Sequence, residues 1–267
     1  MRGVLVACLL LAGGSAVPGQ TPVVTDGGVV NAASFANGQG VTPGSLVSIF
    51  GSELAGSLVQ ADSIPLATQL GNVSVTFNNI PAPLLFVSGG QINAQLPWDA
   101  LPAGTTSGAV NVVVTRGGTP SQPKTVQAAP FSPGIFAVNF GVGPAIAINL
   151  DGTLAAAAGS VSGLTTHPAQ RGDTIIILAT GLGAVDIPVA NGQSSTDQLR
   201  RTTTVPTVLF GGMPATQVDF SGLAPQFVGV NQINVKIPAN APVGNLVPLQ
   251  LQMGGITTTD KVTIAIQ

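Results

Sequence analysis

The amino-acid sequence predicts an all-β chain with two tandem sandwich domains, and composition, residue alternation and internal duplication carry this prediction. The 267 residues include 35 glycines and 21 prolines, and charged residues make up only 7%. Glutamate occurs once, at Glu53. Such a composition disfavours helices, because glycine and proline destabilise helix interiors and few charged residues are available to add salt-bridge pairs. Valine, isoleucine and threonine between turn residues favour short strands instead.

Several segments alternate apolar and polar residues, as half-buried strands do. Residues 73–77 place two valines and a phenylalanine on one face and serine and threonine on the other. Residues 91–96 and 262–266 repeat this pattern. Residues 175–178 are continuously apolar, which predicts a central strand covered on both sides. Four consecutive alanines within residues 154–163 suit a helical turn, but the flanking glycines and serines favour a loop.

The two halves of the chain carry matching landmarks in the same order. The sequence QINAQLP in the first half corresponds to QINVKIP in the second, a Pro-x-Gly turn follows each, and FNNIPA corresponds to FGGMPA. The paired segments are 91–97 with 232–238, 102–104 with 242–244, and 77–82 with 210–215. The spacing between them drifts, as it would if a duplicated domain had acquired loops of different length.

These observations predict two tandem immunoglobulin-like β-sandwich domains. The boundary is expected where Pro130-Phe131-Ser132-Pro133-Gly134 interrupts the strand pattern. The predicted organisation is a signal peptide at residues 1–19, immunoglobulin-like domain 1 at 20–129 and immunoglobulin-like domain 2 at 130–267. Two prolines within five residues predict a short, stiff linker.

The N-terminus has the features of an export signal. Arg2 precedes an apolar run at residues 4–12, and small residues then lead to expected cleavage after Ala16 or Gly19. No later stretch is long and apolar enough for a membrane-spanning helix, so we expect a secreted or cell-surface protein without an integral membrane segment. Cys8 is the only cysteine. Its surroundings resemble a lipoprotein cleavage box superficially, but no apolar region precedes it, and we expect no lipid, disulfide or thiolate site in the mature chain.

Five groups of residues resemble a known family in their order along the chain. They match the uncharacterised C-terminal domain family of secreted acidobacterial (Solibacter-type) proteins, and the resemblance spans roughly residues 29–267. It implies an IPT/TIG-like, immunoglobulin-like fold of the kind found in cell-surface receptors and bacterial adhesins, and it brings no catalytic residues with it. The matching segments are VNAASF (30–35), PGSLVSIFG (43–51), QINAQLPW (91–98), PGIF (133–136), and RGD (171–173) with ATGLG (179–183).

The sequence indicates no catalytic, cofactor-binding or metal-binding residues. A net charge of -2 offers no basic face for nucleic acid or anionic lipid. His167 is the only histidine, so it lacks a second ligand for a metal and is expected to be a loop residue. The acids are scattered, and Asp151-Gly152 is typical of a hairpin turn. Gly181-Leu182-Gly183 lacks the third glycine of a nucleotide-binding loop and predicts a sharp turn.

Trp98 is the one candidate ligand contact. It follows Pro97 at the end of a predicted strand, and the second half carries Ala239 at the matching place, so the fold itself does not require the aromatic ring. Two interpretations stay open. The ring is either buried under a loop or exposed as a stacking platform for a sugar or a partner.

Three functions are compatible with these features. The first is an exported, non-catalytic module for cell-surface or extracellular adhesion, with a protein or polysaccharide partner and no nucleic acid. The second is a secreted carbohydrate-binding or carbohydrate-active protein, with Trp98 as platform and a pair such as Asp62 and Asp99 acting on sugar. The third is a structural spacer or self-assembly element that uses exposed edge strands.

Overall fold

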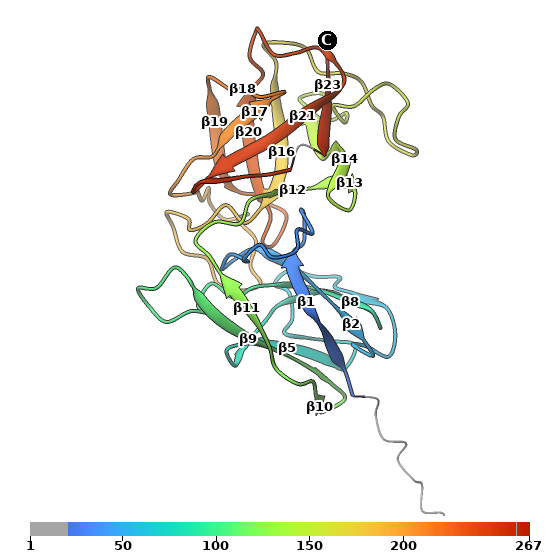
Figure 1. Ribbon diagram of the computed structural model, residues 1–267, viewed down its shortest axis with the longest axis vertical. Helices are drawn as coiled ribbons and strands as arrows, with labels where there is room; N and C mark the ends of the chain where they lie inside the picture. The colour runs from blue at the N-terminus through green and yellow to red at the C-terminus, as the bar shows by residue number, and fades with distance from the viewer. Residues whose placement is uncertain (1–20, 260) are drawn as a thin grey trace, which may run out of the picture.

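The computed structural model describes residues 21–259 and 261–267, so the predicted signal peptide at 1–19, including Cys8, lies outside the described residues. As predicted, the fold is all-β: the described part of the chain forms 23 strands and no helix. These residues therefore contain no helix that could cross a membrane. The strands build two sandwiches that are stacked along the long axis of the molecule (Figure 1).

The first sandwich contains strands β1 to β11 in two sheets whose neighbouring strands are antiparallel. One sheet has the order β1 (Val23–Asn31), β2 (Leu46–Ser52), β8 (Gln91–Gln95), β7 (Leu84–Val87) and β3 (Val59–Gln60). The other has the order β10 (Thr119–Pro120), β9 (Gly108–Arg116), β5 (Val73–Phe77) and β4 (Gln69–Leu70), with β11 (Lys124–Ala128) paired to β9 and β6 (Ile80–Pro81) paired to β5.

The second sandwich contains strands β12 to β23. One sheet has the order β12 (Gly134–Ile135), β16 (Thr174–Thr180), β20 (Asn231–Lys236) and β19 (Val218–Leu223), with β15 (Ala147–Asn149) paired to β16. The other has the order β13 (Ala137–Asn139), β14 (Val142–Ala145), β23 (Val262–Ile266), β21 (Gly244–Met253), β17 (Thr207–Phe210) and β18 (Met213–Pro214), with β22 (Ile256–Thr257) paired to β21. The β14–β23 pair is parallel.

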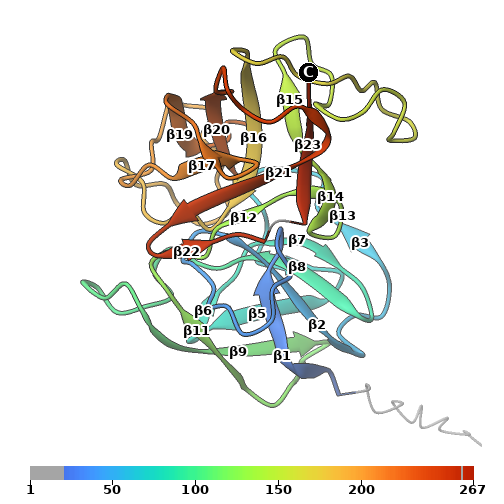
Figure 2. The same cartoon turned by 45° about the horizontal axis from the view of Figure 1, so that its top comes forward.

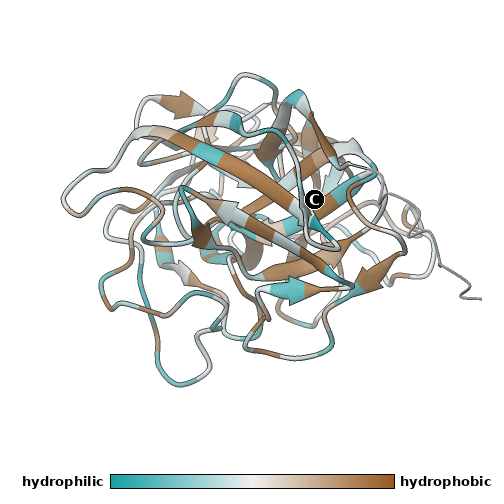
Figure 3. Cartoon of the chain, turned by 90° about the horizontal axis from the view of Figure 1, so that it is seen from below, coloured by the Kyte–Doolittle hydropathy of each residue, from teal (hydrophilic) through white to brown (hydrophobic). Residues whose placement is uncertain are grey.

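Each sandwich has its own hydrophobic core. Phe77 and Phe210, the matching phenylalanines of the two halves, are both 0% exposed, and each belongs to a separate cluster of buried side chains. The buried members of the first cluster lie between residues 24 and 128, and those of the second between residues 135 and 266. Figure 3 shows brown and paler residues alternating along the strands, as the sequence pattern predicts for half-buried strands.

Strand β16 differs in one respect from the prediction of a strand covered on both sides. It is central in its sheet, with β12 and β15 on one edge and β20 on the other. Ile175 and Ile177 are fully buried in the core, but Ile176 and Leu178 on the opposite face are only half-buried. The continuous apolar run therefore serves a core on one face and a partly covered surface on the other. Residues 154–163 form a loop, as expected, with Leu154 buried.

A third, smaller cluster joins the sandwiches. Leu46 of β2 packs with Ala224 and Val230 of the second domain, and the half-buried Phe136 and Leu178 lie against them. Figures 1 and 2 show that β12 to β14 lie at the end of the second sandwich nearest the first. The domains therefore touch through apolar side chains as well as being joined by the linker.

Two-residue hairpin turns are frequent, and they account for eight of the 35 glycines. Type I′ turns need positive φ at both central residues, which favours glycine and asparagine. Within the described residues, six hairpins have this pattern: Gly71-Asn72, Asn78-Asn79, Gly117-Gly118, Phe140-Gly141, Gly211-Gly212 and Gly254-Gly255. Phenylalanine at position 140 is the exception in this set.

Candidate functional site

The joint between the sandwiches is fixed by buried polar side chains, and Thr180 at the end of β16 is one of them. Its hydroxyl accepts a hydrogen bond from the Leu46 backbone N of the first domain at 3.0 Å and donates to the Gly229 carbonyl at 2.6 Å. Thr180 is 0% exposed. Because this hydroxyl is both donor and acceptor and is shielded from water, its hydrogen bonds orient β2 against the second sandwich.

Asn31, at the end of β1, ties the first domain to the linker. Its Nδ2 donates to the Ser132 carbonyl at 2.7 Å, while its Oδ1 accepts from the backbone N of Ala33 and of Ser34 at 2.8 and 3.0 Å. The side chain is 1% exposed. One buried amide therefore holds both the 31–35 turn and the chain that leaves the first domain.

Gln95 of β8 makes a third bridge. Its Nε2 donates to the Gly44 carbonyl at 3.2 Å, and its Oε1 accepts from the Gly192 backbone N at 2.7 Å. The Gly192 carbonyl in turn accepts from the Leu66 backbone N at 2.9 Å. The β16–β17 loop of the second domain is thus hydrogen-bonded to two segments of the first domain, at Gln95 and at Leu66.

A buried arginine shapes that same loop. Arg200 is 5% exposed, and its guanidinium binds the Asp197 carboxylate with both terminal nitrogens, at 2.6 and 3.0 Å. Its Nε donates to the Pro188 carbonyl at 3.2 Å. The hydrogen bonds from Arg200 lower the pKa of Asp197 to about 2, so the pair stays charged at ordinary pH.

Trp98 lies beside these bridges. Its backbone N donates to Asn191 Oδ1 at 2.9 Å, and Asn191 Nδ2 donates to Asp99 Oδ1 at 2.9 Å. The indole ring covers Gly44, where an added Cβ would lie 2.3 Å from the ring. Trp98 is half-buried. The residue therefore packs against the domain joint with one part of its surface and leaves another part free.

The free part of Trp98 lines a cleft of about 500 Å³ between the two domains. Loop residues 101–106 of the first domain form one wall, and Phe131, Ala184 and Thr203 contribute from the linker and the second domain. Among the described residues, two buried side-chain polar atoms have no hydrogen-bond partner, Trp98 Nε1 and Thr42 Oγ1, and both belong to residues of this cleft. The lining is mostly apolar, with few polar groups, as is common in binding sites.

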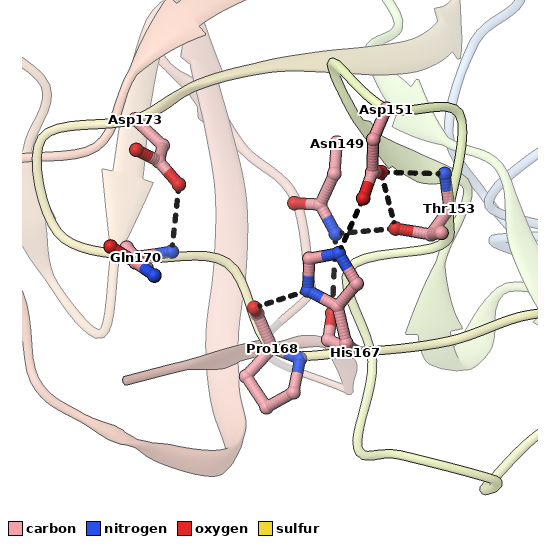
Figure 4. Close-up of polar contacts among 7 residues, drawn as sticks. All are labelled: Asn149, Asp151, Thr153, His167, Pro168, Gln170 and Asp173. Atoms are coloured by element: carbon pink, nitrogen blue, oxygen red, sulfur yellow. Dashed lines mark hydrogen bonds and ion pairs between the residues drawn. The ribbon is translucent and has the colours of Figure 1, made fainter.

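His167 and Asp151 form a separate polar cluster, shown in Figure 4. His167 Nε2 lies 2.8 Å from Asp151 Oδ2, and Nδ1 lies 2.8 Å from the Pro168 carbonyl. Thr153 donates to Asp151 Oδ1 through its hydroxyl and its backbone N. Asp151-Gly152 forms a turn between β15 and Leu154, as predicted. Both ring nitrogens of His167 face oxygen acceptors, so this cluster holds a loop.

We expect the loop around His167 to loosen as pH rises. The hydrogen bond to Asp151, and then that to the Pro168 carbonyl, raise the pKa of His167 above its ordinary value of 6.5. Hydrogen bonds from Thr153, and then from His167, hold the pKa of Asp151 below its usual range. A raised histidine pKa adds stability that is complete below the unfolded pKa and is lost as pH rises through the folded pKa.

Amide hydrogen exchange in residues 150–167 should therefore accelerate, beyond the intrinsic pH effect, when pH increases from about 6 to 8. The variant His167→Gln keeps one donor but cannot titrate, so this extra pH dependence should disappear. An unchanged pH dependence in the variant would show that the histidine does not hold the loop.

The scattered acids do not gather at the cleft. Asp99 lies at the cleft beside Trp98, whereas Asp62 lines a different hollow with Ile64 and Phe227. Residues 21–259 and 261–267 contain no group of three or more metal-ligand side chains. The pair Asp62 and Asp99, considered from sequence for sugar chemistry, is thus distributed over two hollows.

Sequence reasoning did not identify the bridging residues as a group. Asn31, Gln95 and the Thr180-Gly181 pair lie within or directly beside segments that carried the family resemblance, so the signal was present in the motifs. Their role was not visible, because the partners lie far away in the chain: 101 residues for Asn31 and Ser132, and 134 for Leu46 and Thr180.

The comparisons with known proteins agree with an immunoglobulin-like fold. Residues 29–149 match the family model described as IPT/TIG domain, a match that begins in β1 and ends in β15 and covers less than half of the chain. No curated protein matches the sequence. Together with the strand order and the two cores, the match identifies two tandem immunoglobulin-like β-sandwiches. The narrower resemblance to the secreted acidobacterial family stays a prediction.

Three solved structures are similar to the chain at low identity. The I9-I11 tandem from titin shares 12% identity, with 92% of this chain and 66% of that chain covered and a TM-score of 0.22. An endo-fucoidan hydrolase of glycoside hydrolase family 107 shares 10%, with 92% and 29% covered and a TM-score of 0.19. The C-terminal domain of the Streptococcus agalactiae AgI/II polypeptide BspA shares 10%, with 89% and 96% covered and a TM-score of 0.17. The chain spans less than two thirds of the length of the first two structures.

Proposed function

We propose that this chain is an exported, non-catalytic interaction module that acts at the cell surface or outside the cell. The export step rests on the predicted signal at residues 1–19. The immunoglobulin-like fold supports an interaction role, because its loops and sheet faces offer recognition surfaces without any required chemistry. The distribution of Asp62 and Asp99 over two hollows also favours binding over catalysis.

The observation that carries this proposal is the interdomain cleft beside Trp98. Its walls come from both sandwiches, and the buried bridges of Thr180 and Gln95 hold those walls in one arrangement. A preformed cleft binds with little loss of conformational entropy. Tryptophan is also one of the three residue types, with tyrosine and arginine, that are enriched at the positions that dominate binding energy. The proposed partner is a protein or a polysaccharide at the cell surface.

Filling the cleft should weaken binding. Ala103 is exposed and lines the cleft, so Ala103→Trp places a large ring where a ligand would enter. Ala109 is also exposed but lies on β9 outside the cleft, and Ala109→Trp is the matched control. We expect Ala103→Trp to weaken binding of the labelled mature chain to intact cells of the producing organism by about tenfold or more. Ala109→Trp should bind as the unmodified chain does. Flow cytometry over a concentration series measures both.

Three results would contradict parts of this proposal. Equal binding of the two variants would remove the cleft from the interaction. Release of reducing sugar from any polysaccharide by the purified chain would overturn the non-catalytic assignment. If no binding partner is found and small-angle X-ray scattering shows the two domains in the arrangement described here, the spacer function would be favoured. The hydrogen bonds between the domains are also compatible with that function.

A further inference from the structure

Phe140 lies at a position where the local backbone does not favour phenylalanine. With Gly141 it closes the β13–β14 hairpin, and the two residues have φ of 43° and 79°. In the five other two-residue hairpins of this kind among the described residues, both positions are glycine or asparagine. A bulky side chain at positive φ is strained, and such strain persists where the surroundings or a function require it.

The surroundings do not explain the side chain of Phe140, because they do not bury it. The residue is 75% exposed, the highest value among the large exposed hydrophobic side chains of the described chain. Burial in a core therefore gives no compensation for the strain. Backbone strain of this kind clusters at active sites and ligand-binding sites, so the strained turn points to a function for the ring at the surface.

Two further rings support Phe140 from the first domain. Phe35 lies edge-on to it, with 5.6 Å between ring centroids and 69° between planes. Phe50 of β2 lies 6.2 Å from Phe35 at 48°. Phe35 also has a positive φ, of 52°. Two phenylalanines thus hold unfavourable backbone conformations, and their rings meet across the domain boundary.

The position of this aromatic group is fixed by the backbone. At Gly141, an added Cβ would lie 2.7 Å from the Ser34 carbonyl oxygen, so the hairpin tip lies directly on the 31–35 turn. That turn is held in place by Asn31 Oδ1, as described above. The pair of rings formed by Phe140 and Phe35, called the platform below, therefore requires both sandwiches. Its geometry is fixed before any ligand binds.

A hollow of about 390 Å³ lies beside the platform. Phe35, Gly141 and Val142 form its apolar side, and Gln39, Thr257 and Lys261 are among the residues that add amide, hydroxyl and ammonium groups. Phe140 does not line the hollow itself but precedes the lining residue Gly141 in the hairpin. An apolar face next to hydrogen-bonding groups, here amide, hydroxyl and the Lys261 ammonium, is complementary to a pyranose ring with its hydroxyls. The C–H face of such a sugar carries partial positive charge and stacks on the negative face of an aromatic ring, while its hydroxyls reach the polar groups.

We infer that Phe140, supported by Phe35, is a stacking platform for a pyranose unit of a neutral polysaccharide. The chain has a net charge of -2, so it does not attract an anionic polysaccharide as a whole, and the single cation beside the rings, Lys261, can donate hydrogen bonds to the hydroxyls of a neutral sugar. This site is separate from the cleft beside Trp98, because the two hollows have no lining residue in common. Its test therefore does not depend on the fate of the cleft proposal.

The substitution Phe140→Asn separates binding from folding. Asparagine is favoured at positive φ, so the variant keeps the turn and loses only the ring. We expect thermal unfolding at the same temperature as the unmodified chain or a few degrees higher. Affinity electrophoresis through gels that contain xylan, mixed-linkage β-glucan, galactomannan or starch, with sedimentation on cellulose and chitin, measures binding. The unmodified chain should be retained by at least one of these polysaccharides, and Phe140→Asn should bind about tenfold more weakly or not at all.

Phe227 provides the matched control, because it is 50% exposed on a different loop. Phe227→Asn should leave polysaccharide binding unchanged. Three results would overturn the inference. They are a failure of every polysaccharide to retain the unmodified chain, equal retention of Phe140→Asn, or a lower unfolding temperature for Phe140→Asn, which would assign the ring a structural role.

Discussion

Replacing Gly181 by alanine is expected to lower the free energy of unfolding by about 3 kcal/mol or more, one of the largest effects of a single methyl group in this chain. Gly181 has φ of 81°, and an added Cβ would lie 2.0 Å from the Ser132 carbonyl oxygen. The Ser132 backbone N also donates to the Gly181 carbonyl at 2.9 Å. The added methyl group would meet the carbonyl group of Ser132, which belongs to the backbone, so no side-chain rotation relieves the clash. The linker must therefore move away from the end of β16.

Gly172→Ala is the matched control for the conformational part of this loss. Gly172 has φ of 88°, but nothing lies within 4 Å of an added Cβ. The control should lose only about 1–2 kcal/mol, which is the cost of holding a non-glycine residue at positive φ. Urea unfolding followed by the fluorescence of Trp98, the only tryptophan, measures both variants at the domain joint. Equal losses would show that the contact with Ser132 does not constrain the fold.

Replacing Phe77 by alanine is expected to cost about 3–5 kcal/mol, because its ring is completely buried and the cavity cannot collapse. Phe77 ends β5, is 0% exposed and faces the core of the first sandwich. Phe210 holds the matching place in the second sandwich and is also 0% exposed. Phe210→Ala should therefore lower the free energy of unfolding by a similar amount. Comparing the two losses tests whether the two halves are equivalent in stability as well as in sequence.

Differential scanning calorimetry is the suitable measurement for these core variants, since it separates the transitions of domains that unfold independently. Phe227→Ala, at a half-exposed ring, is the control and should cost less than about 1 kcal/mol. A Phe77→Ala variant as stable as this control would contradict the proposed core. A loss for Phe77→Ala without a comparable loss for Phe210→Ala would mean that the two halves are not energetically equivalent.

The strands were the most predictable part of the structure. Residues 73–77 and 262–266 alternate in the sequence, and β5 and β23 have these same bounds. The matching turns after Phe77 and Phe210 also lie where the duplication places them. Alternation and turn chemistry are local properties, and a strand needs only a core on one side to realise them. For β16, the same reasoning overestimated burial, because the degree of cover on the second face depends on the other domain.

The interpretation of Trp98 depended on contacts that no local pattern contains. Sequence left burial and exposure open, and the structure combines a packed ring face over Gly44 with a place on the cleft wall. Gly44 and Asn191, which define this environment, are distant from Trp98 in the chain. The exposure of Phe140 could not be predicted from the sequence either. A phenylalanine before a glycine does not indicate a strained turn until the backbone φ of that turn is known.

Sequence alone was sufficient for the all-β class, for the duplication and for an organisation in two sandwiches, because composition, period and repeated motifs reflect short-range preferences that each half satisfies by itself. Only the tertiary structure revealed that Asn31, Gln95 and Thr180 join the halves, and that a cleft and an aromatic platform arise where they meet. The physical reason is separation: these hydrogen bonds connect groups about a hundred residues apart, so their geometry exists only once both sandwiches have folded and docked.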